Sequence, residues 1–512
     1  MDRPSSSETT IRAAVPCWGA LVCDVQGWSF DDVFRHQFRI SQRPTVASSL
    51  WKTRKLGSFS IEHCPNLPAT KIMNRRGQLI GWCLGIAIDL QGVATGFKDG
   101  SHLTMTATFD AVERRLSQLA GRFAVLVQIG DELRYYPDAT SGLTAVANDG
   151  LETIASTVTL AINDDIQPSG GRTSSDIRGK PTLYLMDETP DARVRQLRSN
   201  HYVDLATFRS HRFWPKDDTP FEPPSEPGQS VARITERVQT IMSSLVTHFD
   251  CTIPITGGRD SRLLAAAVPR KVVDRVGSFY VHEINWSTKF DAESASRVAK
   301  HLDISLHVKR VLSGDCDAEL ATLNLARTRA QIGLATGYAH PHLHPLVLKS
   351  MHIAPGKHLL LRGGAAEVAQ ANKYPPAKQI PKTITPEFAF ERLAGESMSD
   401  LKGQYGEATI ERYWRKYQDW FAEIPEGARP RAVDLGHKEL WLSGGMGAAF
   451  YVPRRHFYMN PYSDQMLLHE TMRFDPAKRK MGRLVKGILD HLSPGLAEVP
   501  YAAQLMKKAR AG

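Results

Sequence analysis

Residues 251 to 262, which read CTIPITGGRDSR, decide the fold of the C-terminal half of this 512-residue chain. The first five residues predict a short buried strand, and a helix is expected to begin near Asp260. Between them, Gly257 and Gly258 let the backbone turn sharply and approach a ligand closely, because neither has a Cβ. A strand that runs through a glycine turn into a helix is typical of a parallel, doubly wound sheet.

Strand and helix signals alternate around this turn. The hydrophobic pattern predicts a helix over 230–248, strands over 251–255, 276–282 and 305–311, and a helix over 291–301. Right-handed crossovers place the carboxyl ends of such strands along one edge of the sheet, where ligands bind. We therefore expect an α/β fold with its binding site directly after residue 255.

The first part of the chain has a different pattern. Short strands are predicted over 79–90, 123–129 and 133–136, the last two as a hairpin that turns at Gly130-Asp131. A helix is expected over 108–119. These signals indicate a sheet-rich α+β domain.

A proline-rich segment separates the two patterns. Residues 215–227, PKDDTPFEPPSEP, contain five prolines, which remove backbone donors and disfavour both helix and central strand. We expect a first domain over 1–214, a linker over 215–229 and a second domain over 230–512.

Composition narrows the class of protein. Hydrophobic residues make up 42% and charged residues 23%, which is normal for a globular chain that buries a core. The net charge of +10 suits an anionic ligand such as a nucleotide, and by itself would also suit nucleic acid. The densest basic cluster, Lys478-Arg479-Lys480, is expected to be a solvated helix face, so we expect no nucleic-acid partner.

Two further features bear on compartment. The six cysteines form no CxxC pair and are expected to be reduced and mostly buried, as in an intracellular protein. No run approaches the roughly 20 apolar residues that a membrane helix needs. We expect a cytoplasmic protein without a membrane span.

The glycine turn carries groups that suit a phosphate. The free N–H groups and the dipole of the helix that follows attract anions, and Thr256 and Ser261 add hydroxyl donors. Asp260 beside a phosphate is explained if it holds a cation, and Mg²⁺ is the cation that prefers carboxylate and phosphate oxygens together. The alternative is an ordinary strand-to-helix turn capped by Asp or Ser.

The complete string Thr-Gly-Gly-x-Asp-Ser, at 256–261, resembles the Ser-Gly-Gly-x-Asp-Ser pyrophosphate loop of ATP pyrophosphatases, the family of asparagine synthetases, β-lactam synthetases and lasso-peptide cyclases. No Walker motif GxxxxGK[ST] occurs. The resemblance implies a doubly wound ATP-pyrophosphatase domain of the adenine nucleotide alpha hydrolase type, with ATP and Mg²⁺ as cofactors. In that family a carboxylate attacks the α-phosphorus, and an amine captures the acyl-adenylate as an amide.

Other segments resemble the family in the same order along the chain. They are FDAE at 290–293, LLLRGGAAE at 359–367, NPYSD at 460–464 and the closing helix with its Pro turn at 486–500. In the first half, LAGRFA at 119–124 and YPDATSG at 136–142 resemble the hairpin of the glutaminase domain. The resemblance therefore implies an N-terminal α+β domain of the Ntn-hydrolase type.

The site residues that the resemblance implies fall into three groups. ATP and pyrophosphate are expected to bind at Thr256, Gly257, Gly258, Arg259, Asp260, Ser261 and Gly364. The metal is expected at Asp260, and the catalytic groups are expected to be Glu367, Lys507 and Lys508.

The chain departs from the family at the position of the glutaminase nucleophile. Working glutaminase domains begin with a cysteine after Met1, whereas this chain has Asp2, and Cys17 lies well inside. We expect a degenerate glutaminase domain that serves as a scaffold. The amine is then ammonia, an amine substrate or the substrate's own amine.

Two departures concern the synthetase site. Ala366 stands where the family has its second metal-binding aspartate, although Glu367 is retained. The family's C-terminal lysine falls near residues 500–502, and Lys507 and Lys508 are the nearest ammonium groups; a solvated basic tail is the alternative. Arg262 is expected either to add charge near the phosphates or to face solvent.

The sequence thus predicts an AMP-forming, ATP-dependent carbon–nitrogen ligase that joins a carboxylate to an amine. The alternative is a relative that binds a nucleotide or a partner protein without catalysis. Asparagine, a cyclised peptide, a lactam and an amidated sugar acid would all use the same intermediate, so the acceptor stays open.

Three histidines alternate at His340, His342 and His344. In extended backbone they would share one face and could bind Zn²⁺. No carboxylate or thiolate lies nearby in the sequence, which favours structural or surface histidines over a metal site. The resemblance places this segment where the family forms part of the acceptor pocket, so contact with substrate is the preferred functional interpretation.

Overall fold

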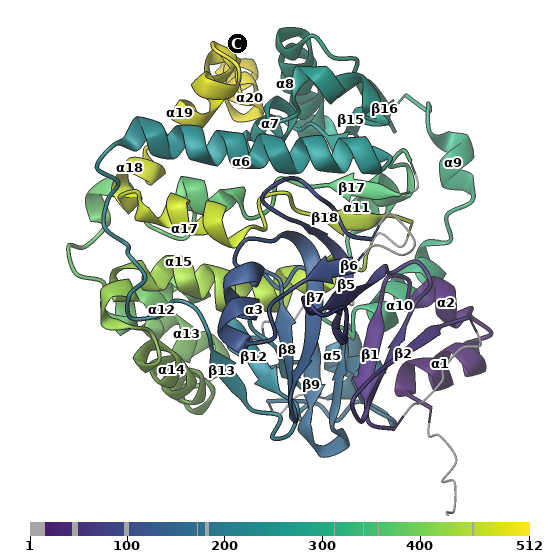
Figure 1. The fold of residues 1–512 in the computed structure, drawn as a ribbon. Coiled ribbons are helices and arrows are strands. Elements are labelled where there is room, and N and C mark those ends of the chain that lie inside the picture. Colours follow the sequence, from purple (N-terminus) through teal and green to yellow (C-terminus); the bar gives the residue numbers. More distant parts are fainter. Residues whose placement is uncertain are drawn as a thin grey trace, which may run out of the picture.

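The chain combines three β-sheets with many helices, and one of the sheets is entirely parallel (Figure 1). The expected α/β class is confirmed at this level. The computed structural model describes residues 16–43, 50–96, 102–170, 173–179, 184–311, 313–340, 343–356, 358–452 and 455–511.

Two largely antiparallel sheets form the N-terminal half, which here means the described residues up to 214. The first has the order β11-β9-β10-β1-β3-β2 and the second β13-β12-β8-β7-β5-β4-β6. The strands of the first sheet are β1 (Phe38–Ser41), β2 (Lys52–Leu56), β3 (Phe59–His63), β9 (Val146–Asn148), β10 (Thr153–Ala155) and β11 (Arg195–Gln196). Those of the second are β4 (Ala69–Met73), β5 (Leu79–Ile88), β6 (His102–Thr104), β7 (Ala120–Ile129), β8 (Glu132–Pro137), β12 (His201–Asp204) and β13 (Ser210–Arg212).

Alternation along β5 explains how the second sheet is packed. Trp82, Leu84 and Ile86 belong to the core that also holds residues of the first sheet, whereas Cys83 and Ala87 lie on the opposite face. That outer face is covered by α3 (Phe109–Leu116). The predicted strands, the hairpin at Gly130 and the helix are confirmed, because period-2 and period-3.6 patterns are local properties of the sequence.

Short helices pack against the first sheet. They are α1 (Trp18–Gln26), α2 (Phe30–Val33) and α4 (Val158–Ala161), and α5 (Ser174–Gly179) lies nearby. Their apolar side chains form a second cluster together with Leu334 and Ala335 at the end of α10 (Leu325–Ala335). A segment from the C-terminal half therefore completes the packing of this sheet.

The parallel sheet has the strand order β16-β15-β14-β17-β18. Its strands are β14 (Cys251–Pro254), β15 (Ser278–Glu283), β16 (His307–Arg310), β17 (Leu359–Leu361) and β18 (Phe457–Met459). The three strands predicted from the sequence are confirmed. The chain builds outward from β14 to β16 and then returns to the other side of β14, so the order reverses between β14 and β17. Ligands of open α/β sheets bind at such a switch point.

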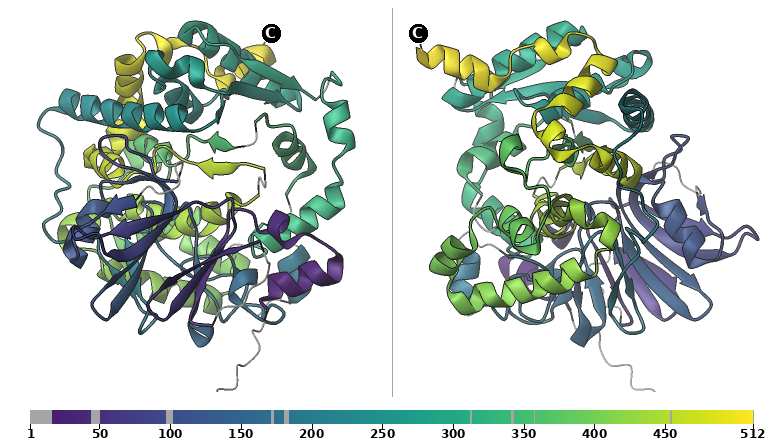
Figure 2. Two further views of the ribbon diagram at one scale, coloured as in Figure 1. Left: turned by 45° about the vertical axis from the view of Figure 1, so that its right-hand side comes forward. Right: turned by 90° about the vertical axis from the view of Figure 1, so that its left-hand side faces the viewer.

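Helices surround the parallel sheet (Figure 2). They are α6 (Pro227–His248), α7 (Arg259–Ala266), α8 (Trp286–Leu302), α17 (Gln465–Arg473), α18 (Pro476–Lys480), α19 (Arg483–Leu492) and α20 (Ala502–Ala511). The predicted helices exist, but two begin earlier than expected. Proline is tolerated in the first turn of α6, and a capping box between Asn285 and Thr288 starts α8 at Trp286.

Further α-helices belong to the C-terminal half. They are α9 (Asp317–Ala321), α11 (Pro345–His352), α12 (Pro386–Ala394), α13 (Met398–Tyr405), α14 (Glu407–Ala422), α15 (Ala432–Gly436) and α16 (Gly447–Ala449). Between α15 and α16 runs η6 (His437–Met446), a ten-residue π-helix. Such helices are rare and often mark functional sites.

A buried arginine ties the two halves together. Arg237 on α6 donates to the Asp464 carboxylate at 2.7 Å and to the carbonyl oxygens of Ile88 and Asp89 in the N-terminal half. The hydrophobic core is also continuous from the space between the antiparallel sheets to the parallel sheet.

All six cysteines are unpaired and buried, as the sequence predicts. Across the part of the chain that the structure describes, no helix has the length and apolar character needed to span a bilayer.

Candidate functional site

The loop after β14 is closed by its own hydroxyl groups. The Ser261 hydroxyl accepts a hydrogen bond from the Thr256 amide at 2.9 Å and donates to the Thr256 carbonyl at 3.1 Å. The Thr256 hydroxyl oxygen also lies 3.0 Å from the Ser261 hydroxyl oxygen. Thr256 and Ser261 therefore hold the turn in shape from both ends.

The two glycines of the loop have different surroundings. A Cβ on Gly257 would lie 2.1 Å from Cβ of Ala502, so the start of α20 packs directly on this residue. The Gly257 amide donates to Asp291 on α8 at 2.9 Å. Gly258 is exposed and caps α7 without any side-chain hydrogen bond. The first turn of α7 thus presents amide donors at an exposed position.

The loop after β17 meets the loop after β14. A Cβ on Gly363 would lie 2.7 Å from the backbone of Asp260, and one on Gly364 would lie 2.6 Å from the side-chain amide of Asn460 after β18. Adjacent parallel strands bring these turns to one edge of the sheet. The structure thereby joins three segments that are far apart in sequence.

Asp260 and Glu367 form the acidic part of the site. Burial, followed by the negative charge of Glu367, raises the pKa of Asp260 to about 7. Gln370 donates a hydrogen bond to Asp260 and opposes this shift. Asn460 Oδ1 and the Tyr462 hydroxyl are buried nearby and lack hydrogen-bond partners among the described residues.

Glu367 differs from Asp260 in its partners. Its carboxylate lies 3.5 Å from Nε2 of His437, the first residue of the π-helix. Burial alone would raise its pKa, but His437, Arg362 and Lys373 together hold the pKa of Glu367 below its ordinary value. Glu367 is therefore held as an anion beside a carboxyl group that ionises less readily.

Cations surround the two carboxyl groups. Arg362 leaves the end of β17 and acts electrostatically on both Asp260 and Glu367. Lys373 lies over the ring of Trp441 at 4.0 Å, and burial lowers its pKa. Arg259 is exposed at the start of α7. Burial, followed by the positive charge of Arg259, lowers the pKa of Lys480. The positive charge suits an anionic ligand.

The expectation that Lys478-Arg479-Lys480 is a solvated face is wrong for its second residue. Arg479 is fully buried and binds the Asp434 carboxylate in bidentate fashion at 2.6 and 3.0 Å. It also donates to the carbonyl oxygen of Val368 at 2.6 Å, in the turn that carries Glu367. For Arg262, the alternative of facing solvent is wrong as well, because that side chain is fully buried.

Arg262 holds the segment that precedes α20. Its guanidinium donates to the carbonyl oxygens of Leu496 at 3.1 Å, Val499 at 2.6 Å and Pro500 at 3.3 Å, and lies 3.8 Å from the ring centre of Tyr501. The guanidinium of an arginine can satisfy several carbonyls at once, which makes burial of its charge tolerable.

Lys507 and Lys508 lie on α20 and are exposed. Lys508 borders a surface hollow between α8 and α20, together with Glu293 and Arg297. Within the described residues, no contact joins either lysine to Asp260 or Glu367.

The other candidates from the sequence lie apart from this cluster. His344 caps α11, and its Nδ1 accepts from the Leu346 amide, while His342 and Asp2 lie outside the described residues. No group of three or more His, Cys, Asp or Glu side chains in the described ranges is arranged to hold a metal ion. Cys17 is buried, and burial raises the pKa of its thiol to about 11.

Sequence reasoning missed the cationic and aromatic half of the cluster. Arg362 and Lys373 flank Glu367 within six residues, so their nearness was a usable signal. His437 and Trp441 lie about seventy residues further along, in a π-helix that no local pattern announces. The chain matches no family model, and it matches no curated protein.

Proposed function

We propose that this protein binds ATP at the loop after β14 and activates a carboxylate as an acyl-adenylate, which an amine then captures as an amide. The observation that carries the proposal is the meeting of the Thr256–Ser261 loop with Gly363 and Gly364 at the point where the strand order reverses. Glycines in both turns leave backbone N–H groups accessible at the N-terminus of α7.

The phosphate groups are assigned to the open end of α7. Gly258 and Arg259 are exposed there, and the helix dipole favours an anion. Arg259 and Lys480 supply further positive charge to the same end of α7. The remaining loop residues keep the turn closed.

Asp260 fits Mg²⁺ on the chemistry around it. The Asp260 carboxyl group is largely shielded from water and lies beside the Glu367 anion. A divalent cation bound there would offset the repulsion between the two carboxylates. Magnesium is commonly bound by one or two carboxylates together with phosphate oxygens and water, so the loss of an aspartate at Ala366 is compatible with a site. When bound, the ion would offset the charge of the phosphates.

Glu367 is assigned as the base that accepts a proton from the attacking amine. His437, Arg362 and Lys373 favour its ionised form. Lys373 and Arg362 are assigned to the negative charge that develops on the phosphoryl group and the tetrahedral intermediate. They take the role that the resemblance implies for Lys507 and Lys508.

The N-terminal half is proposed to be a degenerate Ntn-hydrolase-like scaffold over 1–214, linked through 215–229 to the synthetase domain over 230–512. Two sheets packed around a shared core support this assignment. A buried Cys17 thiol with a raised pKa supports the absence of a cysteine nucleophile at that position. The six unpaired cysteines support a reducing, cytoplasmic compartment.

One observation favours a non-catalytic relative as the second candidate. The Gly257 amide is occupied by Asp291, and Ala502 packs on the same glycine, so part of the loop faces protein. A protein of this kind would bind nucleotide without turnover.

Carboxylate-dependent exchange of labelled pyrophosphate into ATP tests the proposal. Aspartate and a panel of other carboxylic acids are tried with the wild type and with Asp260→Asn. Exchange that one acid induces, and that Asp260→Asn abolishes, would establish adenylation. ATP binding without exchange for any acid would favour the second candidate, and equal exchange in the variant would remove Asp260 from the site.

A further inference from the structure

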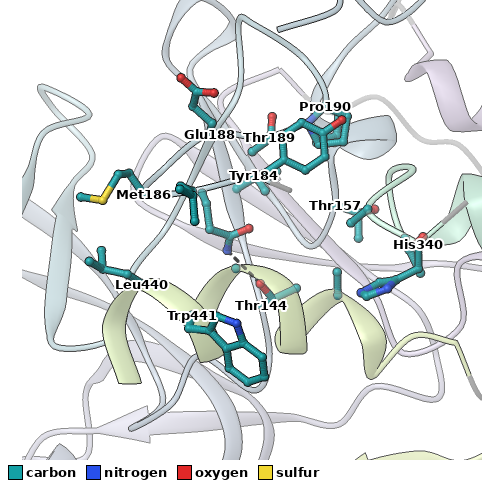
Figure 3. Close-up of a pocket in the computed structure, with 18 of the residues that line it drawn as sticks. Thr144, Thr157, Tyr184, Met186, Glu188, Thr189, Pro190, His340, Leu440 and Trp441 are labelled. Carbon is teal, nitrogen blue, oxygen red and sulfur yellow. Dashed lines mark hydrogen bonds between the residues drawn. The ribbon is translucent and has the colours of Figure 1, made fainter. Parts of the chain in front are cut away.

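A cavity of about 280 Å³ lies between the two halves of the molecule (Figure 3). One wall comes from the N-terminal half, including Val146 on β9 and the Leu185–Met186 segment. The other comes from the π-helix, through Leu440, Trp441 and Gly444, and from the segment after α10. No residue expected from the sequence to bind ATP lines it, but His340, one of the three alternating histidines, does.

The hydroxyl groups along the wall are engaged by the protein. Thr189 donates to the carbonyl oxygen of Val194 at 2.7 Å, and Thr336 donates to that of Ile332 at 2.8 Å. Thr157 donates to the side chain of Gln37 at 3.1 Å. Since these hydroxyl protons are already used, the three threonines offer the cavity no free donor.

The charged residue and the amide at the wall are also paired. Glu188 accepts from Arg412 at 3.0 Å and from Tyr413 at 2.6 Å. Gln196 donates to Thr144 and to the carbonyl oxygen of Ala145, both at 2.9 Å. Among the described lining residues, Glu188 and Gln196 are thus already paired within the protein, and the Val, Leu, Met and Trp side chains suit a hydrocarbon group.

One indole belongs both to the wall of this cavity and to the charged cluster. Trp441 lines the cavity, and Lys373 lies over the same ring at 4.0 Å. The His437 ring is centred 5.4 Å from that of Trp441, and His437 contacts Glu367. The wall of the cavity and the groups assigned to carboxylate activation thus share the Trp441 side chain.

We propose that the cavity receives the apolar part of the substrate, so that the carboxylic acid carries a hydrocarbon group. This inference rests on the proposed function for the role of the acid. The volume is about twice that of a roughly 150 Å³ apolar cavity known to bind benzene. A medium-length alkyl chain or a single aromatic group matches it better than a small polar acid such as aspartate.

Calorimetric titration of the whole protein with straight-chain acids from butanoic to decanoic tests the proposal without requiring catalysis. Each methylene that enters the cavity should lower Kd about fourfold, until the cavity is full and the gain stops. Equal Kd values along the series would overturn the proposal.

Two variants that add bulk to opposite walls of the cavity give a second test of the proposal. A Cβ at Gly444 would have only Gln196 near it, at 4.0 Å, so Gly444→Leu has room to project into the cavity. Ala339→Leu adds bulk from the segment after α10. Each of these two variants should raise the Kd for octanoic acid at least tenfold. Gly403→Leu, at a position with no neighbouring atoms on α13, is the matched control and should bind as the wild type does.

The outcomes separate this inference from the proposed function. If Gly444→Leu and Ala339→Leu both weaken binding of the acid, the cavity is its binding site, even if no acid induces pyrophosphate exchange. Exchange that occurs with short acids and does not improve with chain length supports adenylation and overturns the cavity proposal. A folded filling variant, judged by its circular dichroism, that binds octanoic acid as the wild type does would also overturn it.

Discussion

The pKa values of two carboxyl groups, the partly buried Asp260 and the fully buried Glu439, are shifted in opposite directions because their charged neighbours differ. Burial and the charge of Glu367 raise the pKa of Asp260 to about 7. Burial opposes ionisation of Glu439 too, but Arg212, which donates to it at 2.8 and 2.9 Å, lowers its pKa to about 2. Asp260 is open to a cation, whereas Glu439 already has its counter-ion.

The Glu439 ion pair predicts a dependence of stability on acid. A carboxyl group with a lowered pKa stabilises the fold above its unfolded pKa of about 4.5, and this contribution is lost as pH falls towards 2. From the shift, it is on the order of 3 kcal/mol. Urea unfolding of Glu439→Gln should show a loss of that size at pH 7 and a shallower decline in acid. Exposed Glu396→Gln should match the wild type; an equally steep decline in Glu439→Gln would contradict the assignment.

Gly363 predicts a selective loss of nucleotide binding. A methyl group at this position would meet the backbone of Asp260 at 2.7 Å, so Gly363→Ala must displace the start of α7. Calorimetry with Mg²⁺-ATP should show a Kd at least tenfold higher. Gly403→Ala, which meets no neighbouring atom, is the control. An unchanged Kd in Gly363→Ala would remove this turn from the site.

At the scale of elements, one buried arginine binds several carbonyl groups of the segment before α20. Arg262 bonds to three carbonyl oxygens between Leu496 and Pro500, and Ala502 then packs on Gly257. The last helix is therefore positioned on the loop by a residue inside α7, three positions after Arg259.

Arg262→Met should release this segment, because it retains an apolar stem and removes every donor. Hydrogen exchange of amides in residues 496–511 should accelerate at least tenfold, while the strands of the parallel sheet keep their protection. Arg297→Met, at an exposed position on α8, serves as the control. Protection that is unchanged in Arg262→Met would show that other contacts hold α20.

At the scale of the whole molecule, the two halves share a core and are bridged by a buried arginine. Arg237 spans them by binding Asp464 together with carbonyl groups beside β5. Burial of both partners means that loss of one leaves the other charge without compensation.

We expect a single unfolding transition, with tryptophan fluorescence and far-ultraviolet circular dichroism coinciding. Arg237→Leu should lower the free energy of unfolding by about 3–5 kcal/mol in both signals together. Arg233→Leu, one turn earlier on α6 and half-exposed, should cost less than about 1 kcal/mol. Two separate transitions would show that the halves unfold independently.

The elements that local sequence could predict are those with a strong period or a clear turn signal. Strands 251–255 and 123–129 and the helix over 230–248 were found because their apolar residues repeat at 2.0 or 3.6 positions. The start of α8 was placed five residues late, since its capping box depends on Asn285 and Thr288 rather than on hydrophobicity. The π-helix had no signal of its own.

The sequence by itself determined the α/β class and the strand–loop–helix unit at Thr256–Ser261. It also placed glycines and an acidic residue together in the segment 359–367. These are properties of neighbouring residues. Only the tertiary structure decided that Gly363 touches Asp260, that His437 and Trp441 reach Glu367 and Lys373, and that Arg262 and Arg479 are buried. The physical reason is that contact and burial depend on how distant segments pack, and a side chain's charge or polarity does not reveal which segment will cover it.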